Sequence, residues 1–189
     1  MARLPYLQPS DLAPEHRDLL TPRASDGTVP NLYRVLVHGP NVMRKQNALA
    51  MHIRHDSRLD PRLRELAILQ VGYMTKQPYE YSHHVKLAMD FGCTEDDIRA
   101  LADETAGKPS KLDPLSKLVL KAAREMTDDK AMSDATFAAL RQHLDNDRLM
   151  ELVIAIATYN GVIRILNTLQ IDVEDSYKPY LEKFPLPAK

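Results

Sequence analysis

The chain has 189 residues, of which 44% are apolar and 27% are charged, so it is large and apolar enough to form one domain with a buried core. Its formal net charge is −1 and its acids and bases are interspersed, which argues against nucleic acid or a membrane surface as a partner. The one cysteine, Cys93, excludes an intrachain disulfide and a CxxC motif, and the sequence has no glycine-rich phosphate-binding loop.

The sequence shows neither a continuous membrane span nor an export signal. No apolar run approaches the ~18 residues that indicate a transmembrane helix. Residues 1–6 lack the continuous apolar segment of a secretory signal peptide. We therefore expect a cytoplasmic protein without a membrane-spanning segment.

Residues 1–29 are rich in proline and are predicted to form an irregular arm, with a helical turn at residues 14–20. The arm also carries apolar side chains that must pack on something, a neighbouring subunit being one candidate. These side chains are Leu4, Tyr6, Leu7, Leu12, Leu19 and Leu20. The remainder, residues 30–189, is expected to form a single helical domain.

Apolar residues in this domain recur at close to the helical period, and no segment shows the alternation of a β-strand. Capping residues punctuate the pattern: Asp60 precedes Pro61 at the start of one helix, and Gly92 follows the end of the next. We expect helices over residues 30–37, 42–55, 61–75, 80–91, 94–103, 113–126, 133–143 and 148–169. Pro179 and the tail after Phe184 are expected to end the regular structure. The predicted fold class is all-α.

The segment 77–84 carries the most suggestive polar residues. On a helix that Pro78 opens, Glu80 and His84 lie one turn apart on one face, with Gln77 one turn earlier. A carboxylate beside an imidazole is suited to proton transfer near neutral pH. The alternative is structural, because a carboxylate in a first helical turn stabilises the helix dipole and a lone histidine on an apolar face is often a hydrogen-bonded core residue.

Several segments together resemble the carboxymuconolactone decarboxylase family, part of the wider alkyl hydroperoxidase D-like superfamily. They are residues 63–69, 79–84 and 88–92, and also Tyr159-Asn160 and residues 164–167, which resemble the C-terminal helix of the family. The resemblance implies an all-α helical bundle that assembles as a trimer or hexamer, with sites near the subunit contacts.

The peroxidase branch of that superfamily uses a glutamate, two cysteines and a histidine. The resemblance places Glu65 on the glutamate and His84 on the histidine, whereas Gln77 and Glu80 occupy the two thiol positions. Attack of a thiolate on a peroxide needs a cysteine, and Cys93 lies outside the motif. The resemblance therefore favours the decarboxylase branch, and thiol peroxidase activity is not expected.

Decarboxylation of a carboxymuconolactone implies no cofactor, because the unsaturated lactone itself accepts the electron pair. By this resemblance His84 is the proton donor, Glu80 orients it or keeps it protonated, and Glu65 accepts a hydrogen bond or relays the proton. The expected function is that of a cofactor-free carboxy-lyase, similar to 4-carboxymuconolactone decarboxylase, acting on a small lactone or enolisable carboxylic acid.

Substrate contacts are predicted next to the catalytic residues and on the last long helix. The candidates are Gln77, Tyr79, Tyr81, Arg64, Asn160 and Arg164. The tyrosines can equally be core residues, and Asn160 with Arg164 can be a purely structural pair. An anionic substrate also requires a cation, for which Arg54 is a further candidate. His83, one residue off the shared face, is expected to be exposed or at an interface. No histidine pair has the HExxH pattern, so no metal site is expected.

Two other functions fit the same residues. Isomerisation or hydration also depends on proton transfer at carbon, so Glu80 and His84 would keep their roles. The chain can instead be a non-catalytic helical oligomer that binds a small molecule. Release of carbon dioxide from a panel of acids separates the lyase from the isomerase or hydratase, and tolerance of His84→Gln indicates the non-catalytic protein.

Overall fold

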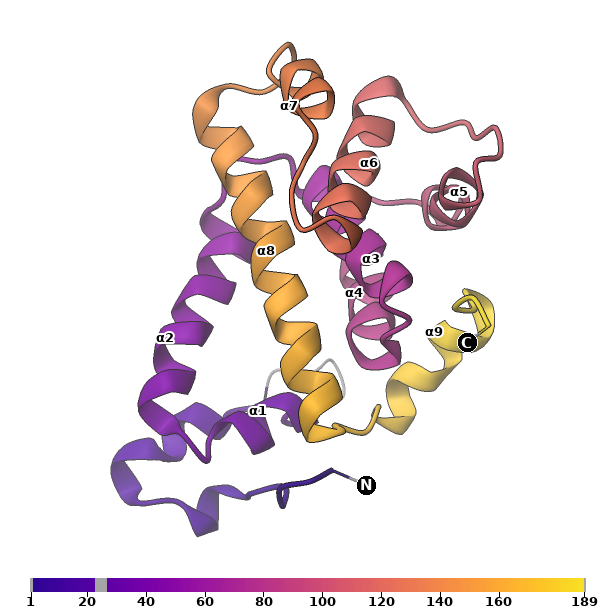
Figure 1. Cartoon of the computed structure of the whole chain (residues 1–189). Helices are drawn as coiled ribbons and strands as arrows, with labels where there is room; N and C mark the ends of the chain where they lie inside the picture. The colour runs from indigo at the N-terminus through magenta and orange to yellow at the C-terminus, as the bar shows by residue number, and fades with distance from the viewer. Residues whose placement is uncertain (1, 23–26, 189) are drawn as a thin grey trace.

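The computed structural model describes residues 2–22 and 27–188, and every regular element within these residues is helical (Figure 1). The α-helices are α1 (Asn31–Leu36), α2 (Pro40–Met51), α3 (Pro61–Met74), α4 (Pro78–Asp90), α5 (Glu95–Thr105), α6 (Pro114–Asp128), α7 (Asp134–Leu140), α8 (Asn146–Leu169) and α9 (Lys178–Lys183). The all-α prediction is confirmed, and each helix predicted between residues 30 and 169 is present, with ends that differ by a few residues.

Helix α3 lies at the centre of the bundle, packed on α4, α6 and α8. Asp60 caps it by accepting a hydrogen bond from the amide of Leu63, and Pro61 occupies its first turn. Its residues 63–72 are all buried, polar ones included, because neighbouring helices cover every side. A charged side chain in such a helix requires a partner of opposite charge or several hydrogen bonds.

A tight turn at Lys76, where φ is 52°, reverses the chain and lays α4 along α3. The two helices approach closely at Gly72, where an added Cβ would lie 3.3 Å from the Cα and Cβ of Tyr81. The Gln77 side chain caps α4 by accepting a hydrogen bond from the amide of Tyr79. As a result, polar residues in the middle of α3 face polar residues of α4.

Helix α2 ends in a π-helical turn, His52–Asp56, where the sequence predicted one continuous helix through residue 55. The turn buries Ile53 in the core and brings Arg54 to the pocket described below. Single π-helical turns occur frequently at functional sites. Here the turn places an arginine in the wall of the pocket.

The N-terminal arm packs on its own chain. Leu19 and Leu20 are buried in a cluster with Met43 of α2. Residue 1 and residues 23–26 of the predicted arm lie outside the described residues. The apolar side chains at the end of the arm therefore have a partner within the same chain.

The prediction that Pro179 ends the regular structure is wrong. Helix α9 begins at Lys178, and Pro179 occupies its first turn, where no backbone N–H is needed for the helix. Phe184, directly after α9, is buried with the Arg99 guanidinium 5.0 Å from its ring centroid. The C-terminal segment is thus attached to the bundle.

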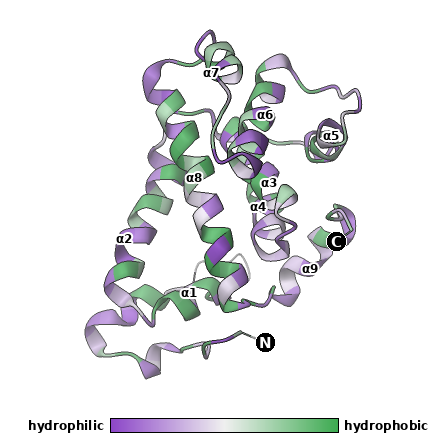
Figure 2. Ribbon diagram, viewed as in Figure 1, coloured by the Kyte–Doolittle hydropathy of each residue, from purple (hydrophilic) through white to green (hydrophobic). Residues whose placement is uncertain are grey.

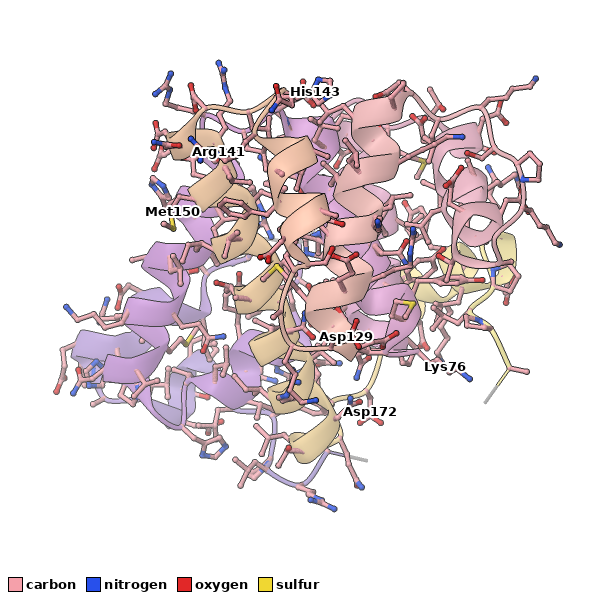
Figure 3. All side chains as sticks on the ribbon, turned by 45° about the horizontal axis from the view of Figure 1, so that its top comes forward. Lys76, Asp129, Arg141, His143, Met150 and Asp172 are labelled. Atoms are coloured by element: carbon pink, nitrogen blue, oxygen red, sulfur yellow. The ribbon has the colours of Figure 1, made fainter. Side chains whose placement is uncertain are left out.

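Helix α8 is long and apolar enough to cross a membrane by length and composition, and no other helix of the described residues passes that test. The expectation of no such span depended on uninterrupted apolar runs, and Asn160 interrupts this one. Core helices pass the same test, and α8 packs on α3 and α6 in the centre of the molecule (Figure 2). Its outer face is exposed at Met150 and Ile154, the first of which is labelled in Figure 3.

Candidate functional site

Four charged side chains form one chain of contacts between α3 and α4. His84 lies between two carboxylates, with Nδ1 2.7 Å from Oε2 of Glu65 and Nε2 2.9 Å from Oε1 of Glu80. Arg64 donates from Nε and Nη2 to Oε1 of Glu65, at 3.0 and 2.9 Å. All four side chains are buried. We call these four residues the charged tetrad.

The tetrad fits a protonated His84. Both ring nitrogens face carboxylate oxygens, and a carboxylate can only accept a hydrogen bond, so both nitrogens must carry a proton. Burial alone would lower the pKa of His84, but Glu65 and Glu80 outweigh it and raise that pKa to about 9. Burial alone would raise the pKa of Glu65, but the charges of His84 and Arg64 bring that pKa below its usual value.

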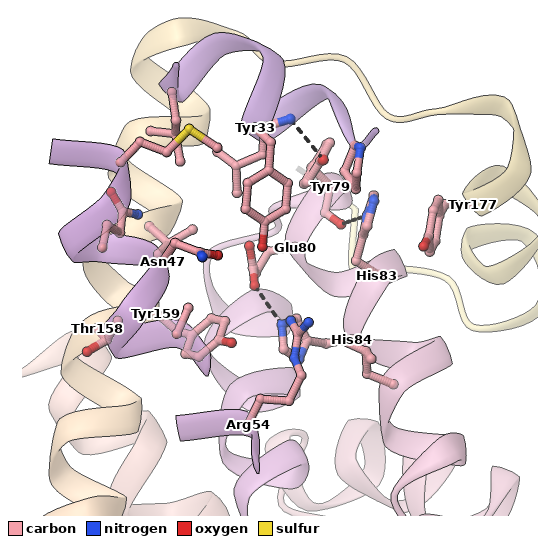
Figure 4. A pocket seen from close by; sticks show the side chains of 18 residues that line it. Tyr33, Asn47, Arg54, Tyr79, Glu80, His83, His84, Thr158, Tyr159 and Tyr177 are labelled. Atoms are coloured by element: carbon pink, nitrogen blue, oxygen red, sulfur yellow. Dashed lines mark hydrogen bonds and ion pairs between the residues drawn. The ribbon is translucent and has the colours of Figure 1, made fainter. Parts of the chain in front are cut away.

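The outer half of the tetrad faces a pocket of about 140 Å³ that α1, α2, α4 and α8 enclose together (Figure 4). Glu80 and His84 line this pocket, and the ring of Tyr159 meets the His84 ring edge-on, with centroids 4.8 Å apart. The other lining residues are Pro30, Leu32, Tyr33, Leu36, Met43, Gln46, Asn47, Ala50, Arg54, Tyr79, His83, Leu87, Thr158, Val162 and Tyr177. Since Glu65 and Arg64 do not line the pocket, only the outer half of the tetrad can reach a ligand.

The structure distinguishes the three candidate cations by their positions. Arg64 is committed to Glu65 and lies with its guanidinium 4.5 Å from the Phe91 ring centroid, outside the pocket. Arg164 is exposed on α8 and donates to the carbonyl oxygen of Asn160. Arg54 lines the pocket and has no carboxylate within ion-pair distance among the described residues. An anionic ligand in this pocket would therefore meet Arg54.

Of the other predicted substrate contacts, Tyr79 lines the pocket and three residues do not. Tyr81 lies in the core between α3 and α5, which favours the packing alternative. Gln77 donates to Oδ1 of Asn167 at 2.8 Å in addition to capping α4. Asn160 donates to Thr127 of α6, at 3.1 Å, so it joins two helices.

His83, expected to be exposed or at an interface, is half-buried and not exposed. Its ring lies between the rings of Tyr79 and Tyr177, with centroids 4.1 and 3.6 Å away. Sequence reasoning also missed Tyr33, Tyr159 and Tyr177 as pocket residues. Tyr159 was within a segment that resembles the family, but its distance from His84 depends on how α8 crosses α4.

The chemistry of a reactive thiol does not fit Cys93. The side chain is buried away from the pocket, with Sγ 3.6 Å from the carbonyl oxygen of Arg62. Burial raises its pKa to about 12, so the thiolate form is scarce at neutral pH. Among residues 2–22 and 27–188, no group of three or more His, Cys, Asp or Glu side chains is placed to hold a metal ion.

Comparisons with known proteins agree with this architecture. Residues 40–113 match the sequence model of the carboxymuconolactone decarboxylase family. No curated protein matches the chain. A solved structure from Ralstonia eutropha, described as an alkylhydroperoxidase AhpD core and an uncharacterized peroxidase-related protein, has a TM-score of 0.77 at 20% identity, covering 98% of each chain.

Two further solved structures share the fold. The debrominase Bmp8 has a TM-score of 0.80 at 16% identity, covering 94% of this chain and 95% of its own. A putative antioxidant-defence protein from Agrobacterium tumefaciens has a TM-score of 0.67 at 18% identity, covering 74% of this chain and 95% of its own. At these identities the likeness shows the helical fold.

Proposed function

We propose that the chain is a cofactor-free carboxy-lyase of the carboxymuconolactone decarboxylase type; the match of residues 40–113 to the sequence model of that family and the helical fold shared with the solved structures support this. Its substrate would be a small lactone or another enolisable carboxylic acid. The observation that supports this most directly is the position of His84 between two carboxylates, which favours its protonated form, with one of them, Glu80, at the wall of an otherwise largely apolar pocket.

The reaction would begin with heterolysis of the bond between the ring carbon and the carboxylate of the substrate. The electron pair of that bond moves into the conjugated carbonyl group of the substrate, giving an enolate, and carbon dioxide leaves. The enolate carbon then needs one proton. In the ligand-free site Nε2 of His84 points at the carboxylate of Glu80, 2.9 Å away. We therefore assign Glu80 the last position of a relay, in which the proton passes from His84 to Glu80 and from Glu80 to carbon.

Glu65 and Arg64 support this transfer from behind. After His84 has lost its Nε2 proton, its Nδ1–H still donates a hydrogen bond to Glu65, and this bond fixes the orientation and the tautomer of the ring. Arg64 keeps the Glu65 carboxylate charged and in place through two hydrogen bonds. A proton from solvent then restores the imidazolium, and the site returns to its starting state.

The pocket suits a ligand of one ring. A cavity of ~150 Å³ in another protein accepts benzene, which is close to the volume of about 140 Å³ found here. The structurally similar debrominase has been solved in complex with 2,3,4-tribromopyrrole, also a single planar ring. Arg54 would hold a carboxylate or oxyanion of such a ligand by charge-assisted hydrogen bonds.

We also propose that the chain self-associates, as a trimer or hexamer. Support comes from apolar side chains exposed on the outer faces of α2 and α8, of which Val42 is 69% exposed and Met150 60% exposed. Such side chains, with Leu49 and Ile154, are typical of a surface that another chain covers. Light scattering after size-exclusion chromatography would measure the number of subunits.

The central test is carbon dioxide release from a panel of lactone acids and unsaturated acids. We expect turnover by the wild type and a loss of at least a hundredfold in Glu80→Gln and His84→Gln, since proton transfer typically contributes ~10²–10⁴-fold. His143→Gln and Glu182→Gln, both at exposed positions, are the matched controls and should be unaffected.

Other outcomes would assign other functions. Incorporation of deuterium from D₂O without carbon dioxide would indicate an isomerase or hydratase with the same residues. Binding of the acids without any turnover, unchanged in His84→Gln, would indicate a non-catalytic protein and contradict the lyase proposal.

A further inference from the structure

The pocket contains one positive charge that the described residues do not compensate. Arg54 lines the pocket, and none of these residues places a carboxylate within ion-pair distance of its guanidinium. Its Nε is buried and has no hydrogen-bond partner in the same part of the chain. The side chain extends from the π-helical turn after α2 toward His84 (Figure 4). A guanidinium with an unused buried donor is suited to bind an anion.

The other charges beside the pocket balance one another within the protein. With His84 protonated, the tetrad contains two positive groups, on Arg64 and His84, and two negative groups, on Glu65 and Glu80. If His84 lost its proton, the tetrad would become negative. In neither state does the tetrad offer a ligand a spare positive charge.

His83 does not supply a second free cation either. Its Nε2 lies 3.2 Å from Oε2 of Glu174, so a positive charge on this ring already has a carboxylate beside it. Among the described residues, no lysine and no arginine besides Arg54 lines the pocket. The other polar lining groups are amides, hydroxyls and phenols, which are uncharged at neutral pH, and burial raises the pKa of the Tyr159 phenol further.

A ligand in this pocket is largely removed from water. Every lining residue is buried or half-buried, and none of them is exposed. Apolar side chains such as Met43, Leu87 and Val162 form much of the wall. A charge in such surroundings is costly unless a charge of opposite sign lies beside it. Arg54 can compensate one carboxylate, and a second carboxylate would have no partner.

We propose that the pocket selects a monoanion, that is, an acid with one ring, one carboxylate and otherwise uncharged substituents. The inference rests on the proposed function, because it takes the pocket as the site of a carboxylic acid. It narrows the substrate class to acids with a single carboxylate and disfavours lactones with two. Uncharged carbonyl, amide or hydroxyl substituents can form hydrogen bonds with the neutral polar groups of the wall.

A monoanion also stays compensated during the proposed reaction. When carbon dioxide leaves, the electron pair of the broken bond carries the negative charge to the enolate oxygen, so the ligand keeps one charge for Arg54 to balance. Protonation of the enolate carbon then gives an uncharged product, which Arg54 no longer attracts. A single arginine therefore favours both the binding of the acid and the release of the product.

The test compares the binding of three furan acids by calorimetry at neutral pH, in one buffer and without measuring turnover. The acids are 2-furoate, furan-2,5-dicarboxylate and the monoamide of that diacid, and the last two share size and shape but differ by one negative charge. We expect the wild type to bind the monoamide more tightly than the diacid by about tenfold or more, because a buried charge without a partner is costly. Binding of 2-furoate should show that one carboxylate is sufficient.

Gln46→Lys is the decisive variant because it adds a second cation to the wall of the pocket. It should raise the affinity for the diacid more than the affinity for the monoamide and so remove most of the difference between them. Ala48→Lys is the matched control: it adds the same charge at an exposed position of α2 that does not line the pocket, and it should keep the wild-type difference. Circular dichroism would check that both variants are folded.

The proposal is wrong if the wild type binds the diacid at least as tightly as its monoamide, or if none of the three acids binds. It is also wrong if Gln46→Lys keeps the wild-type difference, because the preference would then depend on something other than charge. If Gln46→Lys does not fold, the wild-type comparison still decides the matter.

These outcomes are separate from those of the lyase proposal. If no acid releases carbon dioxide, the lyase proposal fails, but the preference for a monoanion can still be measured as binding. If the diacid binds more tightly and carbon dioxide is released from other acids, the selection of a monoanion is refuted and the lyase proposal stands.

Discussion

The buried His84 should make the fold less stable as the pH rises. Glu65 and Glu80 raise its pKa from 6.5 to about 9 in the folded protein, against the effect of burial. The folded chain thus binds this proton more tightly than the unfolded chain, so the stabilisation is complete below pH 6.5 and is lost as the pH rises through 9. Since a tenfold difference in proton affinity corresponds to about 1.4 kcal/mol, the full effect is roughly 3 kcal/mol.

The free energy of unfolding would be measured by urea denaturation followed by circular dichroism, for the wild type and His84→Gln, between about pH 6 and about pH 10. Other groups titrate in both proteins, so the difference between the two curves isolates His84. We expect the wild type to lose roughly 3 kcal/mol relative to His84→Gln over this range.

A second variant, Glu65→Gln, tests the source of the effect. It leaves Arg64 buried with its charge uncompensated, so the variant should be ~3–5 kcal/mol less stable at pH 6. Its stability should also depend less on pH, because only Glu80 remains to favour the protonated imidazole. If the wild-type and His84→Gln curves run parallel between pH 6 and pH 10, His84 is not an imidazolium and the proton relay proposed above loses its source.

Two further predictions concern the pocket and the helix packing beneath it. Arg54→Gln should weaken binding of benzoate by about ten- to a hundredfold, because the arginine that lines the pocket loses its charge. Binding of the neutral benzamide, also measured by calorimetry, should be unchanged. Equal losses for both ligands would contradict an electrostatic role. Gly72→Ala should lower the melting temperature by about 2–4 °C, because the added Cβ meets the backbone and Cβ of Tyr81 at 3.3 Å. This overpacking should outweigh the better helix propensity of alanine by about 1 kcal/mol. An unchanged or raised melting temperature would show that α4 can shift to accommodate the methyl group.

The sequence predicted the helices well because their signals are local. Asp60 and Pro61 start α3, and the break before Pro78 separates α3 from α4. Pro179 misled the prediction because a proline can either end a helix or begin one, and only the packing of Phe184 and Tyr177 makes the second choice favourable. The π-helical turn after α2 has no comparable local signal.

The residues of the candidate site also separate into those that local spacing predicts and those that only the packing of the helices brings together. The pairing of Glu80 with His84 follows from their spacing on one helix, and the resemblance of residues 63–92 to a known family added Glu65. The contact between Glu65 and His84 joins two helices, and no residue spacing gives the distance between them. Substrate contacts were predicted from neighbours in sequence, which is why Tyr81, on the opposite side of α4 from the pocket, was among them.

The sequence by itself therefore determined the all-α class, the order of the helices and the absence of a thiol pair, since each depends on residue type and short-range spacing. Only the tertiary structure decided that Arg54 lines the pocket, that Tyr159 meets His84, and that His83 lies against the C-terminal segment. These contacts join residues that are from about 30 to over 90 positions apart. Their geometry depends on how the helices cross, and that is set by the whole core and not by any local pattern.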